Sequence, residues 1–284
     1  MNDLERNDLE RYDLQRKAAF ERRLLERLAG RIEPFRWGRA FLDDRFPKRW
    51  DSNFLWVEAS LDDVSPGELA AEADRVLGGA GLEHRQVYMD DDAGGARVAP
   101  GLAALGFEPQ HLATMAARRE PDRWSSTPTE EVGFKTIRPA LVTILRREPF
   151  GGDEETVRML ADYRQVAAET VGARFFVTRV DGRIVSACEL YVDGDVAQIE
   201  DVNTLEEFRR RGLARAVVLR AVDEARAAGC DLVFLHAELM DWPKRLYSRL
   251  GFDEIGRLWS FSRPPGSRPP GSRPPGSRPP GKGA

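Results

Sequence analysis

Residues 175–228 constrain the fold of this chain most, because the apolar pattern changes its period once within them. Two Asp-Gly pairs, Asp181-Gly182 and Asp193-Gly194, separate three short stretches rich in apolar residues. Asp-Gly is a favoured pair in two-residue turns between antiparallel strands. From residue 212 onward the apolar positions follow helical spacing instead. The segment therefore predicts a meander of three antiparallel strands, at residues 175–180, 184–192 and 196–204, followed directly by a helix over 212–228.

Shorter elements flank this meander. A helix with apolar residues at helical spacing is predicted over residues 154–170. Residues 232–236 resemble a buried strand, a helix begins at Asp241-Trp242-Pro243 with Asp241 as its cap, and residues 252–262 form a last strand. The order is helix, three strands, helix, strand, helix, strand. It predicts an α/β (α+β) fold with a mixed, mostly antiparallel twisted sheet flanked by helices.

Both ends of the chain are repetitive. Three pentads, NDLER, NDLER and YDLQR, open the sequence, and a five-residue period turns their leucines away from a common helix face. We therefore expect a charged, solvated helical extension over residues 1–30, in which Phe20, Leu24 and Leu28 share one stripe. SRPPG repeats near the other end, and residues 262–284 are expected to be disordered because they have too little apolar surface to bury.

The length of 284 residues allows about two domains of roughly 150 residues. Residues 120–133 are polar and turn-rich, which predicts a linker. The expected globular segments are then residues 31–119 and residues 134–261, called here the N-terminal and the C-terminal segment.

Composition excludes several classes of protein. No apolar run is long enough to span a membrane, and the charged N-terminus has no signal core, so a cytoplasmic protein is expected. Cys188 and Cys230 are expected to be buried, and with His84, His111 and His236 far apart no metal is expected. The net charge of −4 averages an acidic body and a basic tail, so nucleic acid is not an expected partner.

The junction between the third strand and the following helix carries the clearest chemical signal, DVNTLEEFRRRGLARAVV. The first N–H groups of a helix have no intrahelical partner and, with the helix dipole, favour an anion. Gly212 and Ala214 leave room for a phosphate, and Arg209, Arg210, Arg211 and Arg215 add positive charge. This turn alone is equally compatible with a solvated arginine-rich surface. It is neither a P-loop nor a dinucleotide fingerprint.

Two motifs give the C-terminal segment a specific resemblance. Residues 209–214, RRRGLA, resemble the acetyl-CoA pyrophosphate loop Q/R-x-x-G-x-G/A of the GNAT superfamily of N-acetyltransferases. Downstream, residues 246–252, LYSRLGF, resemble the closing L-Y-x-x-x-G-F of that family. The order of elements over residues 134–261 also matches this fold, which implies a splayed pair of strands that binds the cofactor.

The resemblance implies roles for individual residues. The splayed strand pairs with the pantetheine arm through its backbone, and Tyr247 matches the tyrosine that often protonates the leaving thiolate. A core-edge tyrosine without a catalytic role is the alternative. Met240 stands where many relatives have asparagine, which leaves that cofactor contact in doubt, and Asp241 is a weak substitute. The expected cofactor-binding residues are Val202, Asn203, Thr204, Arg209, Arg210, Arg211, Gly212, Leu213, Ala214 and Arg215.

A primary amine must lose a proton before it attacks, so a general base is needed, and the resemblance implies a strand carboxylate in that role. Glu200 and Asp201 are adjacent on the strand before the loop, and strand alternation lets only one of them face the cleft. Glu200 is the first candidate, Asp201 the second, and Glu238 a more distant one. A strand-end carboxylate facing solvent is the alternative for each.

The N-terminal segment resembles a worn copy of the C-terminal one. An offset of 145 residues aligns Leu105-Gly106-Phe107 with Leu250-Gly251-Phe252, so strand, short helix and final strand coincide. Leu102 takes the place of the tyrosine, and the nearest helix opening, residues 64–68, is acidic. We therefore expect a degenerate GNAT-like domain that packs on the active one or shapes its acceptor cleft. The acids at residues 90–92 are either solvated or attract a cationic amine.

These observations predict tandem GNAT-like domains of which the C-terminal one is active. The expected function is an acetyl-CoA-dependent N-acetyltransferase that uses a small-molecule or peptide amine, as a monomer or homodimer. The alternative is a non-catalytic acyl-CoA sensor or scaffold of the same fold. The acceptor is not defined by the sequence, because fold does not determine substrate.

Overall fold

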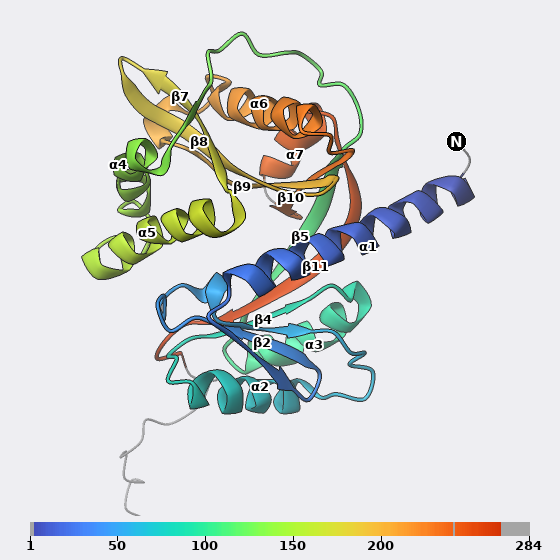
Figure 1. Cartoon of the computed structure of the whole chain (residues 1–284). Coiled ribbons are helices and arrows are strands. Elements are labelled where there is room, and N and C mark those ends of the chain that lie inside the picture. Colours follow the sequence, from blue (N-terminus) through green and yellow to red (C-terminus); the bar gives the residue numbers. More distant parts are fainter. Residues whose placement is uncertain (1–2, 241, 268–284) are drawn as a thin grey trace, which may run out of the picture.

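The computed structural model describes residues 3–240 and 242–267, so the predicted cap Asp241 and most of the SRPPG tail lie outside the described residues. One sheet of eleven strands forms the body, in the order β1-β2-β3-β4-β11-β5-β10-β9-β8-β7-β6 (Figure 1). The N-terminal part contains α1 (Asp3–Leu28), β1 (Arg31–Phe35), β2 (Gly38–Leu42), a 3-10 turn (Trp50–Ser52), β3 (Phe54–Val57), α2 (Pro66–Ala73) with a π-helical continuation (Asp74–Gly78), β4 (Arg85–Met89), α3 (Asp92–Ala104) and β5 (Glu108–Ala117).

The C-terminal part contains the elements that the sequence predicted and two more. Both hairpins are present, and the first has Asp181 and Gly182 at φ 49° and 77°, as a two-residue turn with two left-handed residues requires. The additional elements are α4 and the short strand β6, which occupies the end of the predicted linker. All elements of the C-terminal part, in chain order, are β6 (Glu130–Val132), α4 (Phe134–Leu145), α5 (Glu154–Val171), β7 (Arg174–Val180), β8 (Arg183–Asp193), β9 (Val196–Thr204), a 3-10 turn (Glu206–Phe208), α6 (Leu213–Ala227), β10 (Leu232–Glu238), α7 (Trp242–Arg249) and β11 (Phe252–Arg263).

The last strands of the two segments are exchanged. β11 lies between β4 and β5, with Trp259 opposite Met89, while β5 lies beside β10, with Phe234 opposite Ala116. Each segment thus donates its final strand to a place between the other segment's strands. The sheet is therefore continuous, and the division into residues 31–119 and 134–261 stays a proposal about the repeat.

The expected repeat is visible in the order of elements. β3 and β4 pair in parallel, as do β9 and β10, and each pair is followed by a helix and an antiparallel strand. The offset of 145 residues places β10, α7 and β11 over β4, α3 and β5. The fold is therefore two similar α/β units in one mixed, mostly antiparallel sheet flanked by helices.

The N-terminal helix is less solvated than we predicted. α1 runs across the junction of the two parts (Figure 1), with Phe20 fully buried and its ring 5.6 Å from that of Phe234. Asp13 and Lys17 are also buried, because partners from distant strands pair with them: Arg118 meets Asp13 at 2.6 Å and Asp90 meets Lys17 at 2.8 Å. One side of the helix over residues 13–28 is thus part of the core.

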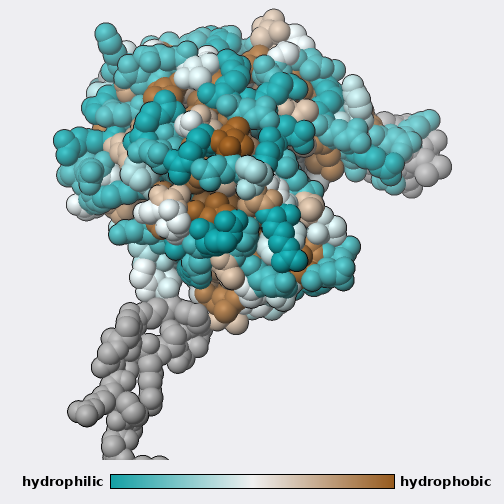
Figure 2. Space-filling view, turned by 60° about the horizontal axis from the view of Figure 1, so that its bottom comes forward, coloured by the Kyte–Doolittle hydropathy of each residue, from teal (hydrophilic) through white to brown (hydrophobic). Residues whose placement is uncertain are grey.

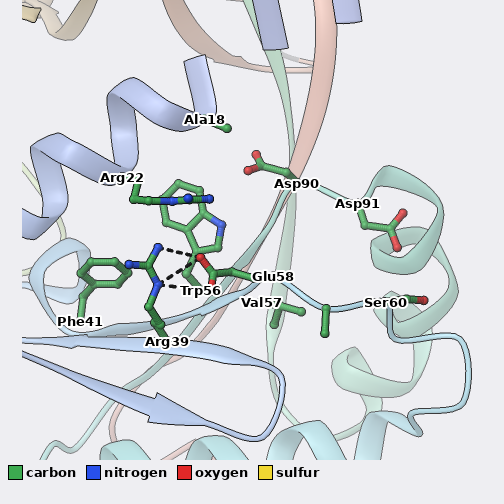
Figure 3. Close-up of a pocket in the computed structure, with 11 residues that line it drawn as sticks. Ala18, Arg22, Arg39, Phe41, Trp56, Val57, Glu58, Ser60, Asp90 and Asp91 are labelled. Atoms are coloured by element: carbon green, nitrogen blue, oxygen red, sulfur yellow. Dashed lines mark hydrogen bonds and ion pairs between the residues drawn. The ribbon is translucent and has the colours of Figure 1, made fainter. Parts of the chain in front are cut away.

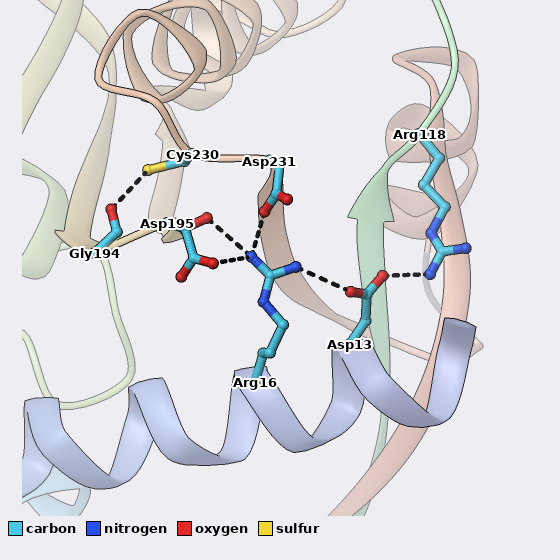
Figure 4. A network of polar contacts seen from close by, with 7 residues as sticks. All are labelled: Asp13, Arg16, Arg118, Gly194, Asp195, Cys230 and Asp231. Carbon is cyan, nitrogen blue, oxygen red and sulfur yellow. Dashed lines mark hydrogen bonds and ion pairs between the residues drawn. The ribbon is translucent and has the colours of Figure 1, made fainter. Parts of the chain in front are cut away.

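Ion pairs join this helix to the two parts of the sheet. In Figure 4, Arg16 of α1 reaches Asp195, at 2.7 Å, and Asp231, which stand at the starts of neighbouring strands. The first turns of the predicted extension are open to solvent, where Leu9 and Tyr12 are exposed. One side of the later turns is also exposed, at Arg22, Arg23, Glu26 and Arg27. The helix therefore covers the sheet at the junction of its two parts.

Apolar side chains are packed on both faces of the C-terminal part. Phe175 packs with α4 and α5, whereas its neighbour Phe176 packs with α6, as strand alternation requires. Cys188 and Cys230 are buried as predicted, with Cys230 next to the carbonyl of Gly194 in Figure 4.

On the face shown in Figure 2, hydrophilic residues cover most of the surface and hydrophobic ones form small patches. No helix among the described residues is long and apolar enough to cross a membrane.

Candidate active site

The strands β9 and β10 diverge after a short common stretch. They pair only through Val196–Gln198 and Leu232–Phe234, although β9 continues to Thr204 and β10 to Glu238. Beyond this point the β9 edge that faces β10 has no strand partner among the described residues. The predicted splayed strand pair is therefore present, next to the RRRGLAR loop (residues 209–215).

A β-bulge lies in β9 at the point of divergence. The register with β8 shifts between Glu200 and Asn203, and Asp201 has a left-handed φ of 50°. Because the bulge adds a residue, Glu200 and Asp201 both line the same cavity. The expectation that only one of them faces the cleft is therefore wrong, since it assumed an unbroken two-residue alternation.

The cavity has a volume of about 1390 Å³ and lies between the two parts of the chain. We call it the central cavity. Its C-terminal walls come from α4, α5, β8 and β9, and its other walls from α1, β4, β5 and residues 47–56. The N-terminal segment therefore forms part of the wall of the cavity that Glu200 lines.

Glu200 is half-buried and is held by the side-chain amide of Gln198. Burial raises the pKa of Glu200 well above its ordinary range, and the nearby carboxylates of Asp201 and Glu21 raise it further. A carboxylate with a raised pKa is a stronger base once it is ionised. Glu200 therefore lines the cavity and is more basic than an ordinary glutamate.

Asp201 has a different environment from Glu200. The Arg164 guanidinium pairs with it and, at 2.8 Å, with the buried Glu189. Burial opposes ionisation of Asp201, but Arg164 holds the pKa of Asp201 below its ordinary value. Tyr191 donates a hydrogen bond of 2.6 Å to Glu189. Asp201 is thus committed to an ion pair.

This network was not predicted from the sequence, although a signal for it existed. Arg164 lies on the apolar side of the predicted helix 154–170, and Glu189 interrupts an apolar strand. Buried charges are normally paired, so these two positions pointed to each other. Glu238, the third candidate base, is exposed, hydrogen-bonds Gln110 at 3.3 Å and does not line the central cavity.

The RRRGLAR loop presents a row of backbone donors. Arg210 and Gly212 have φ of 64° and 80°, and this left-handed geometry turns the chain into α6. Within the described residues, the N–H groups of residues 210–215 have no hydrogen-bond partner. A Cβ at Gly212 would touch nothing, so the space in front of the loop is open. Consecutive free N–H groups at a helix start form an anion-binding site.

The four arginine side chains of this loop have different partners. Arg209 donates to the Thr204 carbonyl at 3.2 Å, and Arg211 donates to the Glu207 carbonyl at 3.3 Å. Arg215 is buried and pairs with Asp122 at 2.6 Å, so its guanidinium holds the linker and only its backbone faces the loop. Arg210 is exposed and has no side-chain partner among the described residues.

The remaining predicted cofactor residues lie on β9 and α6. Val202 packs in the core beside α6, Asn203 lines the central cavity, and the Thr204 hydroxyl lies 2.8 Å from that of Ser186. Leu213 is buried beneath the loop and Ala214 is half-buried. Met240, in the position with the doubtful cofactor contact, is 94% exposed.

Tyr247 lies in α7, on the α6 side of the sheet. Its ring is buried beside Phe252, and its hydroxyl has no hydrogen-bond partner among the described residues. Burial raises the pKa of Tyr247, and the neighbouring Cys188 and Glu200 raise it further, so the hydroxyl keeps its proton at neutral pH. A protonated hydroxyl without a partner is suited to donate a proton.

His236 lines the central cavity but is fully engaged. Its Nε2 lies 2.7 Å from Glu21 and its Nδ1 lies 3.3 Å from the Thr114 hydroxyl. Among the described residues no cluster of His, Cys, Asp and Glu is arranged to hold a metal ion. His236 thus belongs to the polar contacts that fix α1 over the sheet.

The N-terminal segment lacks the corresponding donors. Ser65 accepts from the Glu68 N–H at 3.2 Å, and Glu68 accepts from the Ser65 N–H at 3.0 Å, so a capping box satisfies the start of α2. Leu102, in the place of Tyr247, is fully buried. The segment is therefore a degenerate counterpart without an open anion site at this helix.

The acids at residues 90–92 are mostly engaged. Asp90 pairs with Lys17, Asp91 caps α3, and Asp92 lies 2.6 Å from His111. Asp90 and Asp91 also line a smaller cavity of about 400 Å³ at the end of β3, shown in Figure 3, where Arg39 pairs with Glu58 at 2.7 Å. These acids therefore act mainly in the structure of the N-terminal segment.

Replacing Ser65 by alanine is expected to lower the free energy of unfolding by about 1 kcal/mol, because the cap of α2 is lost. Urea unfolding of the full chain measures this change. Ser248→Ala is the matched control, since Ser248 is an exposed residue inside α7, and the expected change there is within about 0.5 kcal/mol. Equal effects of the two substitutions would contradict the capping box.

Part of this chain matches a known protein family, and most of the chain is similar in fold to solved structures. Residues 139–252 match the model of the acetyltransferase (GNAT) family. A GCN5-related N-acetyltransferase from Kribbella flavida is similar in structure, with 19% identity, a TM-score of 0.60, and coverage of 88% of this chain and 95% of that one. A functionally unknown conserved protein from Staphylococcus epidermidis has 14% identity, a TM-score of 0.61, and coverage of 83% and 94%. The curated protein sequences contain no match. At these identities, the structural likeness concerns the fold of the whole chain.

Proposed function

Since residues 139–252 form an acetyltransferase domain of the GNAT family, we propose that this chain transfers an acetyl group from acetyl-CoA to a primary amine. The transfer occurs by direct attack of the amine in a ternary complex. One observation carries the proposal: the strands β9 and β10 diverge beside a loop whose N–H groups at residues 210–215 have no hydrogen-bond partner in the part of the chain that the structure describes. An acyl-CoA needs both features, a gap between strands for its arm and donors for its pyrophosphate.

The residues of the loop and of β9 fit such a molecule. The N–H groups of residues 210–215 would hold the pyrophosphate, with Arg210 as a free cation at the surface. The open backbone of Val202, Asn203 and Thr204 would bind the pantetheine arm as an added strand. When bound, acetyl-CoA supplies an activated thioester, and backbone N–H groups at the bulge would polarise its carbonyl.

Two side chains on opposite sides of the strand gap supply the proton transfers. Glu200, from the central cavity, would accept the proton that the amine loses, directly or through water. Tyr247, from the α6 side, would donate a proton to the sulfur as the carbon–sulfur bond breaks. The new bond is an amide. Asp201 keeps its ion pair with Arg164 and takes no proton.

A thiol-release assay with acetyl-CoA and a panel of amines tests the function. We expect thiol release above background with at least one amine. The alternative function is a non-catalytic acyl-CoA sensor or scaffold, and the retained hydroxyl of Tyr247 favours catalysis over it. Binding of acetyl-CoA without turnover of any amine would establish the alternative.

Replacing Tyr247 by phenylalanine is expected to lower kcat about 10²-fold, because the leaving thiolate loses its proton donor. Stability is expected to change little, since the hydroxyl has no hydrogen-bond partner among the described residues. Steady-state kinetics with a saturating amine measures kcat. The control is Tyr12→Phe, on an exposed turn of α1. An unchanged kcat in Tyr247→Phe would assign this residue to the core alone.

A further inference from the structure

The central cavity contains an excess of negative charge. Two of its three cationic side chains are paired: Lys48 with Asp153 at 2.7 Å, and Arg164 with Glu189 and Asp201. The third, Arg49, lies 3.7 Å from the ring centre of Tyr163. Burial opposes its charge, but Tyr163 and the nearby Asp51 carboxylate raise the pKa of Arg49, although no ion pair joins it to Asp51 among the described residues. In contrast, several lining carboxylates have no cationic partner among the described residues. These are Asp51, Glu83, Glu108, Glu148 and Glu200.

Two of these unpaired carboxylates come from opposite walls of the central cavity. Glu200 stands at the strand gap, whereas Asp51 belongs to the turn Trp50–Ser52 of the N-terminal segment. They share one electrostatic environment, since the charge of Asp51 contributes to the raised pKa of Glu200. A molecule that reaches from the strand gap to the N-terminal wall therefore meets negative charge at both places.

Aromatic rings surround Asp51. The Tyr88 hydroxyl donates to its carboxylate at 2.8 Å, and the Tyr88 ring packs edge-on against Phe54 at 5.1 Å. Trp50 stacks on His84, with ring centres 5.2 Å apart. Burial lowers the pKa of His84, so this imidazole adds no positive charge at neutral pH. Aromatic faces beside a carboxylate attract ammonium and guanidinium groups.

This wall is fixed before any ligand arrives. Asn53, which is buried, donates to the carbonyls of Phe46 and Arg49 at 2.8 and 3.0 Å, and its own carbonyl meets His84 at 3.0 Å. These contacts hold the turn with Trp50 and Asp51 against β4. A preformed site loses less entropy on binding.

We propose that the acceptor is a small amine with a second positive charge, whose reacting nitrogen lies at Glu200 and whose other cationic group binds Asp51 between Trp50 and Tyr88. This inference rests on the proposed function and deepens it. A monocation of the same length leaves the Asp51 carboxylate with the charge of Arg49 alone, which is not ion-paired with it among the described residues. The N-terminal segment, which has lost its own catalytic features, then contributes the specificity of the shared cavity.

Calorimetry on the full chain tests this proposal with α,ω-diaminoalkanes of increasing length and 1-aminoalkanes with the same number of heavy atoms. We expect the best diamine to bind at least tenfold more tightly than its matched monoamine. Asp51→Asn is expected to remove most of this preference and to change monoamine affinity less than twofold. Asp181→Asn is the control, because Asp181 is an exposed hairpin residue whose left-handed φ asparagine also adopts.

Equal affinity for diamines and monoamines would overturn the inference, as would a preference that survives in Asp51→Asn. The thiol-release assay separates this result from the function itself. Tight diamine binding without thiol release would support the dicationic ligand and contradict the proposed acetyltransferase function. Thiol release with monoamines as fast as with diamines would support the proposed acetyltransferase function and contradict the dicationic acceptor.

Discussion

Replacing Gly212 by aspartate is expected to weaken acetyl-CoA binding by about 10³-fold, to below detection by calorimetry, since each lost charge-assisted hydrogen bond costs about 1.5–3 kcal/mol. Two effects combine at this residue. The carboxylate would stand in the open space before the N–H groups of residues 210–215, where it repels a pyrophosphate and competes for the same donors. The left-handed φ of 80° also strains any side chain, which shifts the loop.

The matched control for this substitution is Gly182→Asp. Gly182 has φ 77°, and a Cβ there also meets nothing, but it lies in the hairpin turn between β7 and β8. Both variants are expected to lose about 1 kcal/mol of stability from the left-handed backbone. Only Gly212→Asp is expected to lose acetyl-CoA affinity. If both variants bind acetyl-CoA as the unmodified chain does, the RRRGLAR loop is a solvated surface.

Local signals in the sequence predicted the parts of the site that local geometry determines. The Asp-Gly turns, the glycine before α6 and the strand lengths each depend on neighbours within a few residues. The left-handed φ of Gly212 is the property for which a glycine is needed at that position. Hence the loop, the helix and the meander were predicted at nearly their observed bounds.

Features that depend on distant partners were not predictable in the same way. β5 and β11 exchange places through strand pairs more than a hundred residues apart, as between Trp259 and Met89. The pentads were predicted to be solvated because their five-residue period turns the leucines away from a common helix face. Asp13 and the following Lys17 are nevertheless buried, because Arg118 and Asp90 pair with them. The bulge at Asp201 has no marker in the sequence, since aspartate tolerates a left-handed φ without requiring it.

The bulge matters for the choice of base, because it brings Glu200 and Asp201 into one cavity and leaves their partners to distinguish them. Arg164 stabilises the charge of Asp201 and thereby makes it a weak base, whereas Glu200 has only an amide donor, from Gln198, and a raised pKa. Charge on Asp201 also raises the pKa of Glu200. In the mechanism that we propose, Asp201 is therefore a fixed anion and Glu200 is the proton acceptor.

Glu200→Gln is accordingly expected to lower kcat by about 10³-fold, within the range for loss of a general base. The unmodified enzyme is expected to lose kcat/KM as the pH falls through the raised pKa of Glu200, because only the ionised carboxylate accepts a proton. This acidic limb should lie above the ordinary glutamate pKa of about 4.3 and disappear in Glu200→Gln. Steady-state rates between pH 5 and 9 measure both changes.

Two matched variants identify which carboxylate acts. Glu238→Gln removes an exposed carboxylate outside the central cavity and is expected to leave kcat and the pH profile unchanged. Asp201→Asn breaks the pair with Arg164, and removing its negative charge lowers the pKa of Glu200, so the acidic limb should move to lower pH while the limb itself remains. If instead Asp201→Asn abolishes the limb and Glu200→Gln keeps it, Asp201 is the base. The ion pair with Arg164 would then have to open in each catalytic cycle.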